Sequence, residues 1–128
     1  MMKKSEILEN RKKWVEKLLD PASLKHEGCL QHPTESNKCC CLGWACVALE
    51  AEFEKTGAYL PEEQREMLGM WYSRGTSNNF SHLGEWKYYS LAAVNDHTDA
   101  TPRDIGRYLE SVIEGGEHTP FIPLSNFS

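Results

Sequence analysis

Four of the five cysteines of this 128-residue chain fall between residues 39 and 46, at the start of an apolar segment. From Leu42 to Phe53, apolar side chains recur at intervals of three, four and seven residues, the spacing of one face of an amphipathic helix. Gly57 then provides a stop. The pattern predicts a helix that begins near Leu42 and continues past Phe53, with three consecutive cysteines packed against its N-terminus.

Three interpretations of these cysteines remain open. The favoured one treats them as reduced thiols that act as small apolar residues in a tightly packed junction, a common environment for free cysteine. The second is a metal site, since zinc binds thiolate and imidazole ligands in tetrahedral sets. Its candidate ligands are His26, Cys29, His32 and Cys39. Against it, the chain has no paired C-x-x-C motif, and adjacent cysteines point in different directions.

The third interpretation is nucleophilic catalysis. The positive end of a helix lowers the pKa of a nearby thiol and so favours the reactive thiolate. Cys40 or Cys41 would be the nucleophile of a hydrolase or transferase, with His82 or His97 as its base. Nothing in the sequence places either histidine near these thiols.

Length and composition predict one domain that folds without disulfide bonds. No apolar N-terminal segment precedes a small-residue cleavage site, and no segment approaches the ~20 apolar residues of a membrane span. We therefore expect a cytoplasmic protein, without membrane contact, whose odd number of cysteines stays reduced. No cofactor is implied.

The net charge of −5 is unevenly distributed. Residues 1–17 contain six basic and three acidic residues, so the N-terminal segment is net positive and the rest is acidic. Such charges usually form the solvated face of a surface helix. Nucleic-acid binding is disfavoured because no further basic face is paired with aromatic side chains.

The remaining pattern predicts an α+β fold, a small single domain in which three to five helices pack with short antiparallel β-hairpins. Helices are expected over residues 5–19, with Ser5 as the cap, over residues 61–68, ended by Gly69, and from Thr101 to Gly115. A short helical turn is expected over residues 91–94. Hairpins are expected between residues 28–30 and 38–40, and around Gly84 within residues 80–89.

The last predicted helix has the clearest start signal. Thr101 precedes Pro102 and stands three residues before Asp104, which is the spacing of a capping box with proline at the first helical position. Residues 1–116 would form the globular domain. Residues 117–128 form a tail whose apolar content predicts docking on its own domain or on a neighbouring subunit, which would make a homo-oligomer.

Several short motifs occur in a familiar order. They are Trp14, Val15 and Leu18; Gly28 and Leu30; Cys40, Cys41, Leu42, Gly43 and Cys46; Leu60 and Pro61; Leu68 and Gly69; Asn95 and Asp96; and Ile105 with Leu109. Over residues 14–113 the chain resembles a family of small, uncharacterised bacteriophage proteins with the pattern C-C-L-G-V-x-C … L-P … L-N-D. It departs at Trp44, where a smaller apolar residue is usual, and at Val47, where an acid is usual.

The resemblance implies a phage setting but no chemistry, so no catalytic residue is carried over. Small accessory phage proteins often block a host defence protein or sequester a nucleotide-type immune signal. We therefore expect a binding protein, with cysteine-dependent catalysis and a structural zinc module as alternatives. Candidate ligand-binding residues are Arg74, Arg103 and Arg107 for phosphate, Trp71, Tyr72 and Trp86 for stacking, and the Asn95 and Asp96 pair, whose side chains readily fix a turn.

Overall fold

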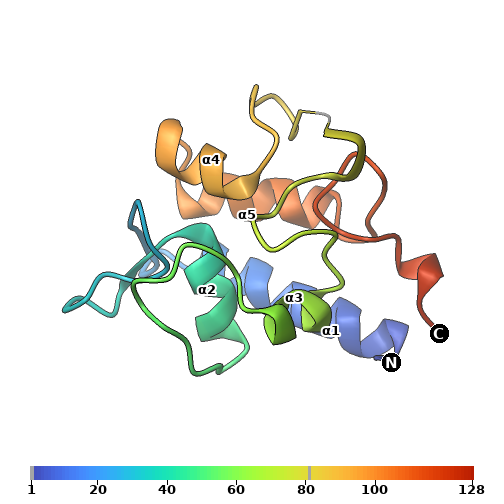
Figure 1. Ribbon diagram of the computed structural model, residues 1–128, viewed down its shortest axis with the longest axis horizontal. Helices are drawn as coiled ribbons and strands as arrows, with labels where there is room; N and C mark the ends of the chain where they lie inside the picture. The colour runs from blue at the N-terminus through green and yellow to red at the C-terminus, as the bar shows by residue number, and fades with distance from the viewer. Residues whose placement is uncertain (1, 81) are drawn as a thin grey trace.

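The computed structural model describes residues 2–80 and 82–128, apart from the side chain of Phe80. In chain order its elements are α1 (Lys4–Leu19), β1 (Leu24–Lys25), β2 (Lys38–Cys39), α2 (Cys41–Ala48), α3 (Glu62–Leu68), the 3-10 helix η1 (Asn78–Phe80), α4 (Leu91–His97), α5 (Pro102–Ser111) and the 3-10 helix η2 (Leu124–Asn126). Five α-helices and a two-stranded sheet form one small domain, which confirms the α+β class (Figure 1). Within the described part of the chain, every helix is too short or too polar for a transmembrane span.

Helix α1 is the support on which α2, α3 and α5 pack. Its apolar stripe is buried, and the indole Nε1 of Trp14 donates a hydrogen bond to the Cys41 carbonyl at 2.9 Å. The contact with α5 is close because Gly106 faces Leu18; a Cβ at Gly106 would lie 3.0 Å from the Leu18 Cβ. The predicted Ser5 cap is wrong, because α1 begins one residue earlier and its N-cap, Lys3, makes no side-chain cap hydrogen bond.

Helix α2 is shorter than predicted. It ends at Ala48 because Glu50 adopts a left-handed conformation with φ of 54° and the backbone turns away. Residues 41–46 are all buried, so this helix is enclosed on every side. Gly43 allows that enclosure, since a Cβ there would lie 1.8 Å from the Leu30 carbonyl oxygen. Gly57, nine residues beyond the end of α2, does not act as its stop.

The sheet corrects the prediction of antiparallel hairpins. Strands β1 and β2 pair in parallel, with Leu24 opposite Lys38 and Lys25 opposite Cys39. The other edge of β2 contacts the segment around Gln31, but this antiparallel pairing is a single bridge between Gln31 and Cys39. The first predicted hairpin is therefore reduced to that bridge. The sequence pattern did not predict β1 as the parallel partner of β2.

The second predicted hairpin also fails within the residues described. Residues 82–89 contain no strand; a single backbone hydrogen bond, from the Leu83 amide to the Tyr88 carbonyl, crosses Gly84, and Trp86 closes a turn on Leu83. The antiparallel bridge in this region joins Thr76 to Ser90, outside the predicted pairing across Gly84. Residue 81, within the predicted hairpin, lies outside the described residues.

The helix signals at Gly69 and Thr101 are confirmed, whereas the predicted stop at Gly115 is not, because α5 leaves the helical conformation at its C-cap, Val112. Gly69 caps α3 in the left-handed conformation, with φ of 62°. Thr101 and Asp104 form the reciprocal capping box of α5, with distances of 3.1 and 2.9 Å. Helix α4 is longer than the predicted turn, and its N-cap, Ser90, accepts a hydrogen bond from the Ala93 amide.

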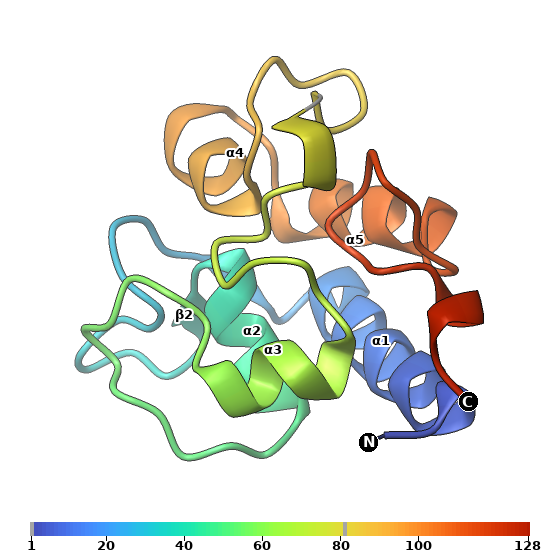
Figure 2. The same cartoon turned by 45° about the vertical axis from the view of Figure 1, so that its right-hand side comes forward.

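The C-terminal tail docks on α1. Phe121 is fully buried and makes an edge contact with Trp14, with ring centroids 5.9 Å apart. Arg11, which the charge pattern placed on a solvated face, is instead fully buried under this tail. Its guanidinium lies 4.3 Å from the Phe121 ring centroid and donates to four backbone carbonyls, those of Leu68, Gly69, Ile113 and Ile122. As a result the two chain termini lie side by side (Figure 2).

Candidate functional site

A small cavity forms where five segments of the chain meet. It has a volume of about 110 Å³ and is lined by Gly28, Cys29, Cys40, Tyr59, Arg74 and Asp96, together with Ala58 and Ala92. These residues come from the loop after β1, the start of α2, the segment before α3, the loop after α3, and α4. Three of them, Gly28, Cys40 and Asp96, belong to the motifs that carried the sequence resemblance.

Asn95 holds the walls of this cavity in place from behind. Its buried Oδ1 accepts a hydrogen bond from the Cys41 amide at 3.1 Å, and its Nδ2 donates to the His26 carbonyl and to Asp96 Oδ1, both at 2.9 Å. Asp96 Oδ1 also accepts from the Gly28 amide at 3.3 Å. The pair therefore joins three parts of the chain, whereas the sequence suggested only a local turn. Asn95 positions the site, and the half-buried Asp96 lines it.

Arg74 and Tyr59 form the exposed side of the cavity. The guanidinium carbon of Arg74 lies 5.4 Å from the Tyr59 ring centroid, which is a cation–π contact. The Leu60 amide donates to the Ser73 carbonyl and the Ala92 amide to the Arg74 carbonyl, so both neighbouring segments hold this backbone. Among described residues, none forms a hydrogen bond or ion pair with the Arg74 guanidinium. Its donors therefore remain available to a ligand.

The candidate ligands of the predicted metal site are only partly brought together. His26 Nε2 lies 3.2 Å from Cys29 Sγ, and the ring of His32 meets the His26 ring at 5.2 Å between centroids. Nδ1 of His32, however, accepts two backbone amide hydrogen bonds, and Cys39 is fully buried with its thiol toward Ser36. Across residues 2–80 and 82–128, no group of three or more histidine, cysteine, aspartate or glutamate side chains is arranged to hold a metal ion.

Cys40 and Cys41 are not placed for nucleophilic catalysis. Cys40 is the N-cap of α2 and its Sγ accepts a hydrogen bond from the Gly43 amide, yet burial raises the pKa of this thiol to about 12. Burial also raises the pKa of Cys41 well above its usual value. Desolvation therefore outweighs the helix dipole here. In the described part of the chain neither thiol has a hydrogen bond to a histidine, since exposed His82 and His97 stack on Tyr89 and Tyr88.

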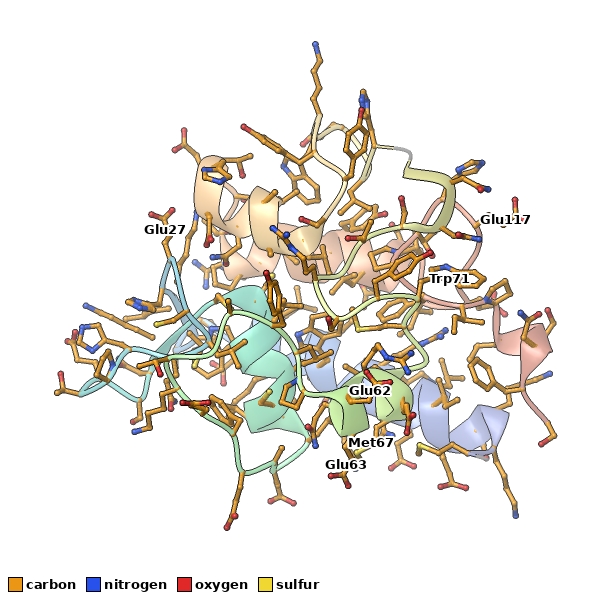
Figure 3. All side chains as sticks on the ribbon, in the orientation of Figure 1. Glu27, Glu62, Glu63, Met67, Trp71 and Glu117 are labelled. Carbon is orange, nitrogen blue, oxygen red and sulfur yellow. The ribbon has the colours of Figure 1, made fainter. Side chains whose placement is uncertain are left out.

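The other predicted ligand-binding residues lie apart from this cavity. Trp71 donates its indole hydrogen to the Gly116 carbonyl at 3.2 Å, and Figure 3 shows it on the side opposite Glu27, beside Glu117. The exposed Tyr72 directly follows it in the loop after α3. Arg103 has one buried nitrogen, Nη1, without a hydrogen-bond partner among the described residues.

Trp86 and Arg107 line a second, open hollow of about 410 Å³ beside α5. Trp86 meets the Tyr108 ring edge-on at 5.5 Å, and Arg107 forms an ion pair with Asp104 at 3.5 Å. Glu85 adds another carboxylate. With two acids and one paired arginine, this hollow is poorly suited to an anion.

A hollow of about 560 Å³ lies between α1, α3 and the tail. Arg65, its only cationic lining residue among those described, donates to Glu62 and to the Met70 carbonyl, so its charge is already neutralised. Glu6 and Glu66 also face it. It lacks the unpaired charge that the smaller cavity presents.

Sequence reasoning placed Arg74 and Asp96 in a ligand site but missed Tyr59 and the role of Cys29. A partial signal was available, because Gly28, Cys40 and Asp96, from three of the motifs that carried the resemblance, converge on this cavity although they are far apart in the chain. No known protein family, curated protein or solved structure matches this chain, so the site is defined by its own geometry.

Proposed function

We propose that this protein is a binding protein for a small anionic ligand of nucleotide type, and that the cavity between Cys29, Arg74 and Asp96 is its binding site. The observation that carries the proposal is the exposed guanidinium of Arg74, which lines the cavity and has no carboxylate partner among the described residues. A planar guanidinium binds phosphate or carboxylate through two parallel hydrogen bonds.

The other side chains of the cavity complement such a ligand. Tyr59 is 54% exposed and offers an aromatic face next to the guanidinium. Across the cavity, the Asp96 carboxylate can accept hydrogen bonds from amino or hydroxyl groups. A volume of about 110 Å³ is below the ~300 Å³ of the smallest typical drug-sized sites, so the cavity takes one group of the ligand. The remainder would lie over Tyr59 and Arg74.

In the phage setting that the resemblance implies, such a protein would sequester a nucleotide-type immune signal of the host. The second candidate is a protein that blocks a host defence protein. It is favoured by the exposed Tyr59, Tyr72 and Arg74, because tyrosine and arginine dominate the energetics of protein interfaces. The two candidates share Arg74 but differ in the size of the surface that contacts the partner.

Calorimetric titration with mononucleotides, cyclic nucleotides, dinucleotides and pyrophosphate tests the first candidate. We expect at least one of these probes to bind, and Arg74→Gln to weaken that binding by tenfold or more. Arg107→Gln is the matched control, because Arg107 is exposed, lies outside the cavity and is paired with Asp104. Equal binding to the wild-type protein and Arg74→Gln would refute the proposal.

Native mass spectrometry of the freshly purified protein complements the titration. Retained mass of nucleotide size would identify the ligand class, and the subunit number would test the proposed homo-oligomer. Retention of a host protein by wild-type protein but not by Arg74→Gln would favour the second candidate instead.

A further inference from the structure

Cys29 differs from the other four cysteines in its surroundings. Cys39, Cys40, Cys41 and Cys46 are buried, whereas Cys29 is half-buried. Cys29 and Cys40 both line the cavity, but only Cys29 is partly exposed. Its Sγ lies 3.4 Å from the Gln31 carbonyl oxygen and 3.2 Å from His26 Nε2, so rotation of the single S–H directs the proton at either acceptor. Of the five thiols, Cys29 is therefore the one best placed to meet a ligand.

His26 is within proton-transfer reach of this thiol. The distance from His26 Nε2 to Cys29 Sγ is 3.2 Å, which is hydrogen-bond distance for a sulfur partner. The histidine itself is held firmly, because its amide donates to the Cys39 carbonyl and its carbonyl accepts from Asn95 Nδ2. The ring of His32 packs edge-on against it. The loop after β1 thus combines a thiol with an imidazole at hydrogen-bond distance, on a backbone that Cys39 and Asn95 hold in place.

We propose that Cys29 is a nucleophilic thiol with His26 as its base, and that it captures an activated acyl compound whose anionic group is bound by Arg74. This inference rests on the proposed use of the cavity as an anion-binding site. Cys29, Arg74 and Asp96 line the same cavity, so one small molecule can contact the guanidinium and the thiol together.

The reaction is an acyl transfer. Cys29 Sγ attacks the carbonyl carbon, a carbon–sulfur bond forms, and the thiol proton passes to His26 Nε2. The bond from the acyl carbon to the leaving group then breaks, and the leaving group departs with its electron pair and accepts the proton from His26. The product is a thioester on Cys29, and no oxidant or reductant is required.

Alkylation with iodoacetate and iodoacetamide tests the nucleophile, with the modified cysteine identified by mass spectrometry. In the native protein we expect Cys29 to react first, because the other thiols are buried. His26→Gln is expected to slow its alkylation at pH 7 by about tenfold. His82→Gln is the matched control, since His82 is exposed and stacks on Tyr89. Arg74→Gln is expected to slow iodoacetate, which is anionic, more than iodoacetamide, which is neutral.

The alkylation rate of Cys29, measured between pH 6 and pH 8, distinguishes a His26 that acts as a base from a His26 that only supports the loop. The charged and titratable groups around the pair are His32 with its partner Glu35 on the same loop, and Asp96 and Arg74 across the cavity. We expect the alkylation rate to fall less steeply toward pH 6 in the wild-type protein than in His26→Gln. Parallel profiles would overturn the role of His26.

Other outcomes would overturn the inference as a whole. They are alkylation of Cys29 no faster than that of an unstructured thiol, or one equivalent of bound zinc that protects Cys29. If Cys29 proves unreactive while nucleotide binding still depends on Arg74, the acyl-capture inference fails and the proposed binding function stands. Loss of the Arg74 dependence in both assays would refute the two together.

Discussion

Arg11 and Arg74 each contact an aromatic ring, but their surroundings give the same side chain two different roles. Arg11 is fully buried over Phe121 and donates four hydrogen bonds to backbone carbonyls, at the C-terminal end of α3, after α5 and in the tail. Arg74 is exposed over Tyr59, and its guanidinium has no hydrogen-bond or ion-pair partner among the described residues. Satisfied donors make Arg11 a structural cross-link, and unsatisfied donors make Arg74 a candidate binding group.

The largest expected effect is on folding, from the buried arginine. Arg11→Met should lower the free energy of unfolding by about 4 kcal/mol, because it removes four hydrogen bonds from a charged donor, two of them buried and two part-buried. The Gly69 carbonyl still accepts from the Ile122 amide, but the carbonyls of Leu68, Ile113 and Ile122 lose the donor that Arg11 supplies. Arg74→Met should change the free energy of unfolding by less than about 0.5 kcal/mol. Urea denaturation measures both. Similar losses in the two variants would contradict the contrast, and Arg11→Lys is a control that keeps the charge but not the planar fork.

The second effect comes from pH and the buried thiols. Burial raises the pKa of Cys39 to about 11 and those of Cys40 and Cys46 to about 12, from a usual 9.0. At pH values between 9 and about 11–12, these thiols are protonated in the folded protein and largely deprotonated in the unfolded chain. Their contribution to the free energy of unfolding is therefore fully present below about pH 9 and is lost as the pH rises toward 11–12. We expect a loss on the order of 1 kcal/mol per thiol for one pH unit above 9.

Denaturation midpoints from pH 7 to pH 10 test this dependence. The Cys46→Ala variant removes one of the raised thiols, so its stability should fall less steeply above pH 9 than that of the wild-type protein. A flat stability profile up to pH 10 would mean that these thiols are not desolvated as the structure indicates.

The third effect concerns the close approach of Leu30 to α2. Gly43→Ala should destabilise the fold by about 2 kcal/mol, because its Cβ would lie 1.8 Å from the Leu30 carbonyl oxygen and the loop beside the cavity must move. Gly116→Ala is the matched control, since the nearest atom to its Cβ would be 3.8 Å away. Thermal denaturation distinguishes them; equal melting temperatures would refute the proposed contact.

The fourth effect, smaller than that of Gly43→Ala, is expected at Asp96. Asp96→Asn keeps the size of the side chain and an oxygen that can accept from Gly28, so we expect a loss of about 1 kcal/mol or less. If a nucleotide binds, this variant should change the order of preference among the probes. Both oxygens of the Asp96 carboxylate accept hydrogen bonds, whereas the asparagine side chain has one oxygen that accepts and one nitrogen that donates. An unchanged preference would remove Asp96 from the site but leave Arg74 in it.

Local sequence signals determined where the helices lie and two of their ends, the C-terminus of α3 and the N-terminus of α5, but not the N-cap of α1 or the end of α2. The capping box of Thr101 and Asp104 and the left-handed Gly69 were predictable, because each depends on residues within one helical turn. The buried stripe of α1 was predictable for the same reason, since helical spacing alone aligns its apolar side chains. The α+β class followed from these signals.

Tertiary structure alone decided how distant segments meet. The parallel pairing of β1 with β2, the burial of Arg11 under the tail, and the junction of Asn95 with the start of α2 join residues 14 to 111 positions apart. The cavity is assembled the same way, from Cys29, Tyr59, Arg74 and Asp96. Periodicity and caps report only neighbouring residues, whereas these contacts depend on which long-range arrangement buries the most apolar surface while satisfying the buried polar groups.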